Sequence, residues 1–179
     1  MAIMRPSVEN TRSLGNFTQM FRWSIMFLSF PSAIAFTPTV DDINFRAQSA
    51  GIPELAGETT TIAIRGNEVR QPGIHKWNSP WAVTLVETTN PVANQFIWEW
   101  SNLCWQSRNG STGVTQNQAD LECDVLVYQL NNLDQPIFAH KLYGCFLENA
   151  TLGQLDSQTS DPQAIECSIA FQRCEREKV

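Results

Sequence analysis

Residues 58–88 read ETTTIAIRGNEVRQPGIHKWNSPWAVTLVET, with a β-prone run at each end and a polar segment between them. The first run, Thr59–Ile64, is rich in β-branched residues, and the second, Trp81–Val86, is apolar and also β-prone. The intervening residues 65–73 carry a Gly-Asn pair near one end and a Pro-Gly pair at the other, which are typical turn signals. This pattern predicts a long two-stranded arm whose tip is far larger than the two-residue turn of a simple hairpin.

The predicted arm is unusual because an isolated hairpin is only marginally stable in water. A compact domain gains little from such an extension, whereas an assembly gains a contact with a neighbouring subunit. We therefore expect residues 58–88 to form an extended assembly hairpin. The alternative is a long surface loop, which composition alone does not exclude.

Length and composition predict a single domain over residues 1–179, with 42% hydrophobic residues available for a core. Twelve basic residues against eighteen acidic ones give a formal charge of −6 and a pI near 4.8. A surface that grips nucleic acid needs Lys and Arg to neutralise phosphates, so this balance argues against such binding. It suits a soluble protein, or one that repels a polyanion.

The cysteines indicate buried free thiols rather than a metal site or a disulfide framework. Their spacing contains no C-x-x-C pair, so zinc binding is not expected, and we expect no metal or other cofactor. An odd number of cysteines is a poor basis for disulfides, whereas Cys packs well as a small hydrophobe in a reducing compartment. The five are Cys104, Cys123, Cys145, Cys167 and Cys174.

The apolar run from Trp23 to Ala35 raises the question of secretion, because its end, Ala33-Ile34-Ala35, resembles a signal-peptide cleavage site. Three features oppose this interpretation: the long leading segment contains Glu9, the apolar core at 25–28 is short, and Pro31 interrupts the run. The run is also too short to span a bilayer, so we expect no membrane contact. A secreted β-sandwich binding module remains an alternative.

Most of the chain has the alternation of strands. Residues 1–16 are polar and are expected to form an N-terminal arm. Six to seven strands, one helix and the turns between them predict a mainly β fold, an antiparallel β-sandwich or barrel. Besides the two runs of the arm, the predicted strands are Phe17–Phe30, Ile43–Gln48, Leu121–Leu130, Ile137–Tyr143 and Ile165–Arg173.

One flanking helix is predicted over residues 91–108, with Asn90 as its N-cap and Pro91 at its first position. Trp98 and Trp105 are seven residues apart and form an aromatic stripe roughly opposite the apolar one, so they are candidates for contact with a partner. The apolar stripe consists of Val92, Phe96, Trp100, Leu103 and Cys104.

Residues suited to catalysis are few, and we do not expect an enzyme. The two histidines, His75 and His140, are in no recognisable metal or nucleophile motif, and no phosphate or dinucleotide fingerprint is present. Glu122 and Asp124 share one strand face, where a solvated acidic surface is the simpler interpretation. A small hydrolase using these carboxylates or His140 is the enzymatic alternative.

The order of these segments resembles the tube proteins of contractile phage tails and related contractile injection systems. Gly51-Ile52-Pro53 follows an early aromatic strand, as in that family. An Arg-Gly turn, a basic-x-Pro-Gly element and a Lys-aromatic pair then lead into the next strand. A helix with a Trp-rich end and a final strand complete the match over residues 17–175. The matching segments are Ile64–Glu68, Arg70–Gly73, Lys76-Trp77, Phe96–Trp100 and Ile165–Ile169.

The resemblance implies a β-sandwich with one flanking helix, assembled as hexameric rings that stack into a hollow tube. It implies a structural protein of a virion, the inner tube of a contractile phage tail, assembled in the host cytoplasm. DNA or a tape-measure protein would pass through the lumen without specific binding. Gln71 at a usually basic position, the cysteines and the polar insertion Leu152–Asp161 depart from the family pattern. The related alternative is an extracellular contractile injection particle that carries protein effectors.

The resemblance also assigns roles to residues and partners. Self-association into homohexameric rings would be accompanied by contacts with sheath, tape-measure, baseplate and tail-terminator proteins. Strand alternation suggests that Glu122, Asp124 and Glu166 face an acidic lumen. The contact residues of the assembly arm would be Arg65, Gly66, Asn67, Glu68, Arg70, Pro72, Gly73, Lys76 and Trp77.

Overall fold

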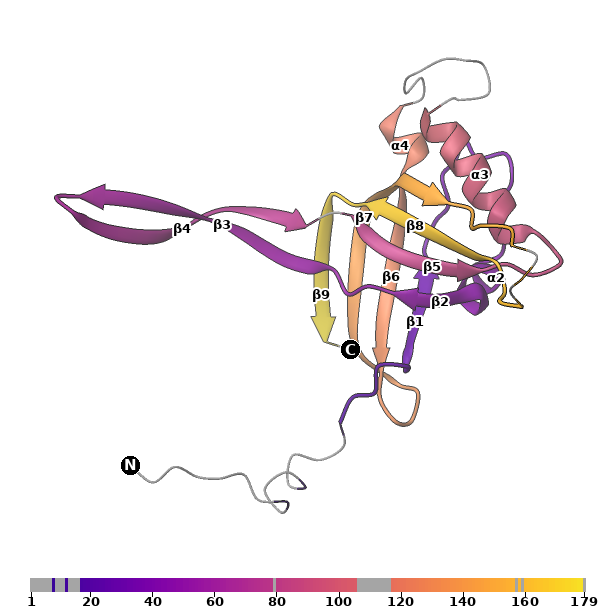
Figure 1. Ribbon diagram of the computed structural model, residues 1–179, viewed down its shortest axis with the longest axis horizontal. Helices are drawn as coiled ribbons and strands as arrows, with labels where there is room; N and C mark the ends of the chain where they lie inside the picture. Colours follow the sequence, from indigo (N-terminus) through magenta and orange to yellow (C-terminus); the bar gives the residue numbers. More distant parts are fainter. Residues whose placement is uncertain are drawn as a thin grey trace.

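The computed structural model describes residues 8, 12, 17–78, 80–105, 117–156, 158 and 160–178, and nine strands and three helices lie within that part of the chain (Figure 1). The fold is mainly β and antiparallel throughout, as predicted. Along the chain, the helices and strands are β1 (Trp23–Phe27), α2 (Val40–Arg46), β2 (Ala47–Ala50), β3 (Glu54–Ile64), β4 (Asn67–Asn78), β5 (Trp81–Val86), α3 (Val92–Trp105), α4 (Gln118–Leu121), β6 (Cys123–Leu130), β7 (Pro136–Thr151), β8 (Ala164–Ala170) and β9 (Arg173–Lys178).

Strand β7 belongs to two sheets. Its first part pairs with β6 on one side and with β9 on the other, and β1 extends this sheet beyond β6. Its second part pairs with β8, which continues through β5 to β2. The strand order is therefore β1-β6-β7-β8-β5-β2, with β9 also on β7. The two sheets enclose the core like a barrel that remains open between β1 and β2.

The change of sheet takes place at a bulge in β7. Tyr143 and Gly144 together lie opposite Asp124, because the pairs on either side are Cys123 with Cys145 and Val125 with Leu142. Gly144 has a φ of 62°, which favours glycine, and its N–H donates to Asp124 Oδ1 over 3.2 Å. The bulge bends β7 so that its remaining residues pair with β8.

The core is filled from one end by α3. Phe96 and Trp100 are fully buried and pack edge-on against Phe27, with ring centroids 6.1 and 6.5 Å away. Trp100 Nε1 donates to the Leu121 carbonyl, so the one polar atom of this side chain is satisfied. Residues 92–105 of the predicted helix 91–108 form α3, and residues 106–108 lie outside the described part.

The N-terminus of α3 is capped by a residue that the sequence pattern did not indicate. Glu87 Oε2 accepts the N–H of Asn94 over 2.6 Å, and its Oε1 accepts the N–H of Thr88 over 2.9 Å. A carboxylate at this position also interacts favourably with the helix dipole. Glu87 therefore fulfils the capping function that was predicted for Asn90.

Three strand predictions were wrong in detail. Of the predicted strand Phe17–Phe30, only Trp23–Phe27 forms a strand, β1. Residues 40–46 form α2 rather than a strand, because Thr39 and Asp42 make a reciprocal capping box. Ile43 is buried and Phe45 is 83% exposed, so these two residues do not share one face as they would in the predicted strand. The final predicted strand, Ile165–Arg173, is interrupted after Ala170, and a separate strand β9 follows it.

The arm consists of β3 and β4, which pair only with each other and project from the barrel (Figure 1). Its tip is a two-residue turn, Arg65-Gly66, in which both residues have positive φ, and not the large tip that was predicted. Pro72 and Gly73, which indicated a turn, lie within β4. The second predicted run, Trp81–Val86, is β5 and belongs to the barrel.

All five cysteines are free and buried, as the sequence indicated. Burial raises the pKa of the Cys104 thiol to about 11 and those of Cys145 and Cys167 to about 12. It also raises the pKa values of Cys123 and Cys174. The folded protein therefore holds these thiols protonated and chemically unreactive.

The raised thiol pKa values predict a loss of stability in alkaline solution. The buried, protonated thiols contribute their full stability below the thiol pKa of the unfolded chain. This contribution is lost as the pH rises toward the higher thiol pKa values of the folded protein. The free energy of unfolding should fall above about pH 9, by up to about 1.4 kcal/mol per pH unit for each thiol. Urea denaturation at several pH values measures this slope, and Cys167→Ser should reduce it. An unchanged slope in that variant would contradict the prediction.

The bulge predicts a specific cost for replacing Gly144. In Gly144→Ala the new methyl group would lie 2.8 Å from Gln172 Cγ, at a residue with positive φ. We expect a loss of about 1–2 kcal/mol in the free energy of unfolding, measured by chemical denaturation. Gly57→Ala is the matched control, because nothing lies within 4 Å of its added methyl group and its stability should hardly change.

Candidate assembly surfaces

The distal part of the arm has one apolar face. Ile62 pairs with Val69 and Ile64 with Asn67, so these four side chains lie on the same face of the ribbon. Ile62, Ile64 and Val69 are 41%, 58% and 46% exposed. The opposite face carries polar residues such as Glu68 and Arg70. Exposed isoleucine and valine on a two-stranded ribbon make this face a candidate contact surface.

The predicted contact residues occupy different parts of the arm. Arg65 and Gly66 form the turn, and the other seven lie along β4. Lys76 and Trp77 are near its base, opposite Ala56 and Leu55. The side chains of Lys76 and Trp77 are outside the described part. Asn67, Glu68, Arg70, Pro72 and Gly73 lie between the turn and that base.

Pro72 and Gly73 each have a local structural role. Pro72 pairs with Thr59 on a strand whose other edge is unpaired among the described residues, where a missing N–H is tolerated. A Cβ on Gly73 would lie 3.0 Å from both the Glu58 carbonyl oxygen and Thr60 Oγ1. Gly73 therefore permits close approach of the two strands at the arm's bulge.

Glu122 and Asp124 are close together at the bend of β7. Glu122 precedes β6 rather than lying within it, and its Oε1 accepts from the side-chain amides of Gln118 and Gln172. Asp124 accepts the Gly144 N–H, as described above. Both carboxylates thus help to hold the bend in addition to any role at a surface.

Glu166 lies elsewhere, on the outward face of β8. The paired residues across this sheet form a row of small hydroxyl side chains, Ser49 with Thr84, Thr84 with Glu166, and Glu166 with Thr151. The stretch of β7 from Gly144, beside Asp124, to Thr151, beside Glu166, is seven residue steps long, or up to roughly 23 Å of strand. The three acidic residues therefore form no single patch within one subunit.

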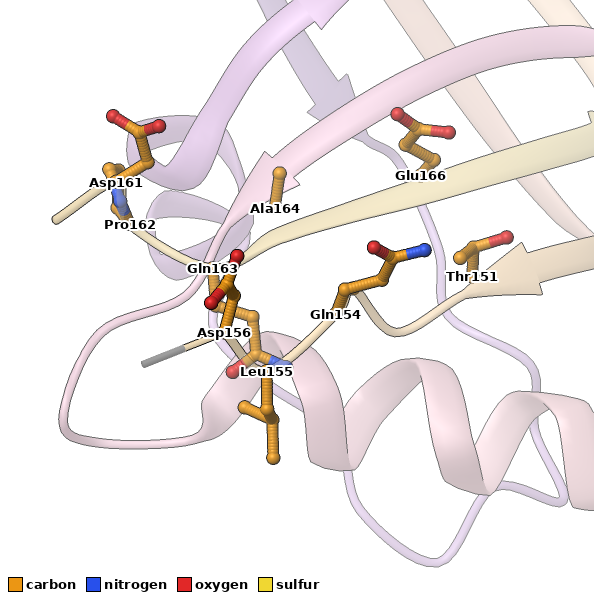
Figure 2. Close-up of a pocket in the computed structure, with 10 residues that line it drawn as sticks. Thr151, Gln154, Leu155, Asp156, Asp161, Pro162, Gln163, Ala164 and Glu166 are labelled. Atoms are coloured by element: carbon orange, nitrogen blue, oxygen red, sulfur yellow. The ribbon is translucent and has the colours of Figure 1, made fainter. Parts of the chain in front are cut away.

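A hollow of about 840 Å³ lies beside Glu166, between the end of β7 and the start of β8. Asp156, Asp161 and the 93% exposed Leu155 come from the polar connection between these strands. Figure 2 shows the residues that line the hollow, with Glu166 and Thr151 on the strands. The hollow adds acidic groups to the face that carries Glu166.

The arrangement around His140 offers no support for hydrolysis. Burial, and then the charge of Arg176, lower the pKa of His140, which pairs with Val127 and Arg176 across neighbouring strands. In the described part of the chain, no hydrogen bond joins His140 to Glu122 or Asp124. Within that same part, no group of three or more His, Cys, Asp or Glu side chains is arranged to bind a metal. None of the helices in the described part of the chain is long and apolar enough to cross a membrane.

Trp98 and Trp105 lie on the outer side of α3, 50% and 44% exposed. Trp105 lines a small apolar hollow together with Phe146 and Leu121, whereas Trp100 on the other side of the helix is fully buried. Both side chains are thus exposed, and their contact with a partner stays a prediction.

Comparison with solved structures identifies the fold. Over 92% of its length the chain matches 93% of a chain from the anti-feeding prophage tube-terminating cap, with a TM-score of 0.65 and 12% identity. The fold is that of a contractile-system tube protein. A chain from the PVC sheath/tube terminator, part of an extracellular contractile injection system, gives a TM-score of 0.64 at 11% identity, covering 92% and 99% of the two chains.

The tube-protein fold extends over nearly the whole chain. In the PVC sheath-tube complex, a chain matches at a TM-score of 0.62 and 14% identity, with 97% of this chain and 99% of that chain covered. These three similar structures come from a tube-terminating cap, a sheath/tube terminator and a sheath-tube complex. No protein-family model matches the sequence, and no characterised protein matches it at the sequence level.

The sequence interpretation missed the apolar face of the arm. It selected turn and charged residues, although Ile62 and Ile64 stand at alternate positions of β3 and Val69 is the one apolar residue among the polar residues 67–71. The Pro-Gly pair suggested that this second segment was a loop. Correct pairing of Ile62 with Val69 would have revealed the face.

The two tryptophan environments predict opposite effects of substitution. Trp98→Ala should change the free energy of unfolding of the subunit by no more than about 1 kcal/mol, because half of the side chain is already in solvent. Trp100→Ala should cost about 3–5 kcal/mol through the loss of core packing. Chemical denaturation of both variants tests this, and equal costs would contradict the assignment of Trp98 to the outer surface.

Proposed function

We propose that this chain is a structural subunit of the inner tube of a contractile injection machine and assembles as stacked hexameric rings. The end-to-end match with a chain of a sheath-tube complex is the observation that supports this proposal best. The arm agrees with it, because its apolar face and unpaired edges need a neighbouring subunit. The residues from Arg65 to Trp77 that the sequence indicated would lie at this contact.

Partners follow from the same role. The similar structures include sheath-tube, terminator and baseplate assemblies, which supports corresponding contacts for this subunit. Trp98 and Trp105 on α3 are the exposed aromatics proposed to meet such a partner. The subunit would reside in the assembled particle after assembly in the host cytoplasm, with a tape-measure protein inside the tube during assembly.

The lumen is proposed to be acidic. Six copies of a chain with charge −6 give −36 for each ring, and a negative wall lets a polyanion slide without binding. Glu166 is the most exposed of the three proposed lumen residues and lies in a row of small hydroxyl side chains. Glu122 and Asp124 would contribute their charge from the bend of β7.

The type of machine is proposed from the similar structures. Two of them come from an extracellular contractile injection system, which favours a particle carrying protein effectors. A phage tail tube that conducts DNA has the same structural requirements and is the second proposal. A terminator that caps a tube is the third, because terminator chains match equally well.

The proposal predicts rings or tubes of the purified protein. Negative-stain electron microscopy should show six-fold rings, and long tubes would favour a tube subunit over a terminator that forms single rings.

Replacement of Thr61–Arg70 by an Asn-Gly turn should abolish stacking, because it removes the apolar face but leaves the pairing of Thr60 with Gln71.

Thermal unfolding provides the control for this arm variant. Its melting temperature should equal that of the wild-type subunit, because the core lies in the barrel. Tubes formed by the shortened variant would contradict the role of the arm. A wild-type protein that stays monomeric at high concentration, with or without a purified terminator or baseplate complex, would contradict the proposed function.

A further inference from the structure

The barrel has an open seam between β1 and β2, the two ends of its strand order. A groove of about 850 Å³ lies along this seam, lined by both strands, by the segment before β1 and by part of β6. Its lining is mixed and includes Gln19, Arg22 and Gln48. Three apolar side chains of the lining are well exposed: Met20, Phe21 and Ile52 are 96%, 72% and 52% exposed.

Backbone groups are available on both sides of the groove. The Leu130 N–H donates to the Arg22 carbonyl, and the Leu28 N–H donates to the Asp124 carbonyl. The backbone groups of even-numbered residues in and beside β1 therefore point toward β6. Those of odd-numbered residues, including the N–H and C=O of Trp23, point away from it. On the other side, the Gly51 N–H donates to the Ala82 carbonyl. Because backbone groups alternate in direction along a strand, the N–H and C=O of Ala50 point away from β5. Both strands therefore present an edge to the groove.

One end of the seam is closed by the chain itself. Asn44 Oδ1, from α2, accepts the outward N–H of Ile25 and the hydroxyl of Ser24, each over 3.1 Å. An intramolecular side chain thus satisfies the middle of the β1 edge. Around Trp23, the described part of the chain contains no comparable partner for the outward N–H.

The seam differs in charge from the other free edge of the same sheet. Strand β9 reads Arg-Cys-Glu-Arg-Glu-Lys, and charged side chains on an edge discourage pairing with another chain. Strands β1, Trp-Ser-Ile-Met-Phe, and β2, Ala-Gln-Ser-Ala, carry no charge. The protein protects one edge by charge and leaves the seam receptive to another strand.

The arm shows the complementary asymmetry. Its strand β4 carries Glu68, Arg70 and Pro72, whose charges and missing N–H make its outer edge a poor pairing partner. Strand β3 is uncharged and β-branched from Thr59 to Ile64, and its outer edge is also unpaired among the described residues. The arm cannot enter the seam of its own chain, because β2 leads directly into the arm and the arm projects away from the barrel (Figure 1).

We infer that Thr59–Ile64 of a second copy of this chain adds as a strand to the seam between β1 and β2. Strand addition satisfies the outward backbone groups of Trp23 and Ala50 and buries Ile62 and Ile64 among the apolar residues that surround the groove. It also removes the free edges of both partners, as closure does in a complete barrel. The inference rests on the proposed self-assembly and names the receptor site for its arm.

Mixed single-cysteine variants of the full chain test this docking. The native thiols are buried, so a bismaleimide reports on the introduced ones. Thr61→Cys in β3 and Gln48→Cys in β2 should give a cross-linked dimer on mixing under assembly conditions. Docking raises the effective concentration of the two thiols, so the yield should exceed that of Thr61→Cys with Glu177→Cys in β9 by about tenfold or more.

A charge substitution provides the second measurement. Gln48→Lys places a charge at the seam, and we expect it to abolish assembly without changing the melting temperature. Glu177→Lys, on the already charged β9, should leave assembly intact. Assembly of Gln48→Lys at wild-type concentrations would overturn the docking site.

The outcomes separate this inference from the proposed function. Rings or tubes with no excess of the seam cross-link over the β9 control would overturn the inference alone. Absence of rings and tubes from the wild-type protein would overturn the proposed function, and the inference with it.

Discussion

The bend at Gly144 is the constraint on which the rest of the structure depends. A single strand can serve two sheets only if it changes direction sharply, and the bulge opposite Asp124 provides that change. The N–H of Gly144 would otherwise lose its ladder partner inside the fold, and the carboxylate of Asp124 satisfies it. The two sheets diverge from this point, so that α3 can place Phe96 and Trp100 between them.

The same arrangement leaves the barrel incomplete. The strand order passes through β7 and ends at β1 and β2 rather than closing on itself. An open seam and an isolated ribbon are both poor solutions for a monomer, since each exposes unpaired backbone and apolar side chains. Both would become favourable in the proposed assembly, where copies of the chain supply each other's missing strands. In that proposal, the fold of the subunit and its assembly have a common structural origin.

Local patterns predicted the strands better than their connections. Alternation identified β5, β6 and β8, because each has one face in the core and one outside it. It failed at residues 43–48, where a short alternating pattern is also compatible with one helical turn and the Thr39–Asp42 capping box decides the outcome. It failed again at Pro72-Gly73, where an edge strand tolerates residues that normally end one. The double pairing of β7 depends on contacts distant in sequence, which no local pattern contains.

For the candidate site, alternation showed which side chains face outward but not what they contact. It placed Glu122, Asp124 and Glu166 outside the core, and all three are at least partly exposed. The first two bind amide groups at the bend, because a carboxylate is also the acceptor that a buried N–H needs there. Only Glu166 lies on an open, regular sheet face, surrounded by hydroxyl groups that demand no counter-ion. A lumen that repels a polyanion would therefore depend most directly on this residue and on the acidic connection beside it.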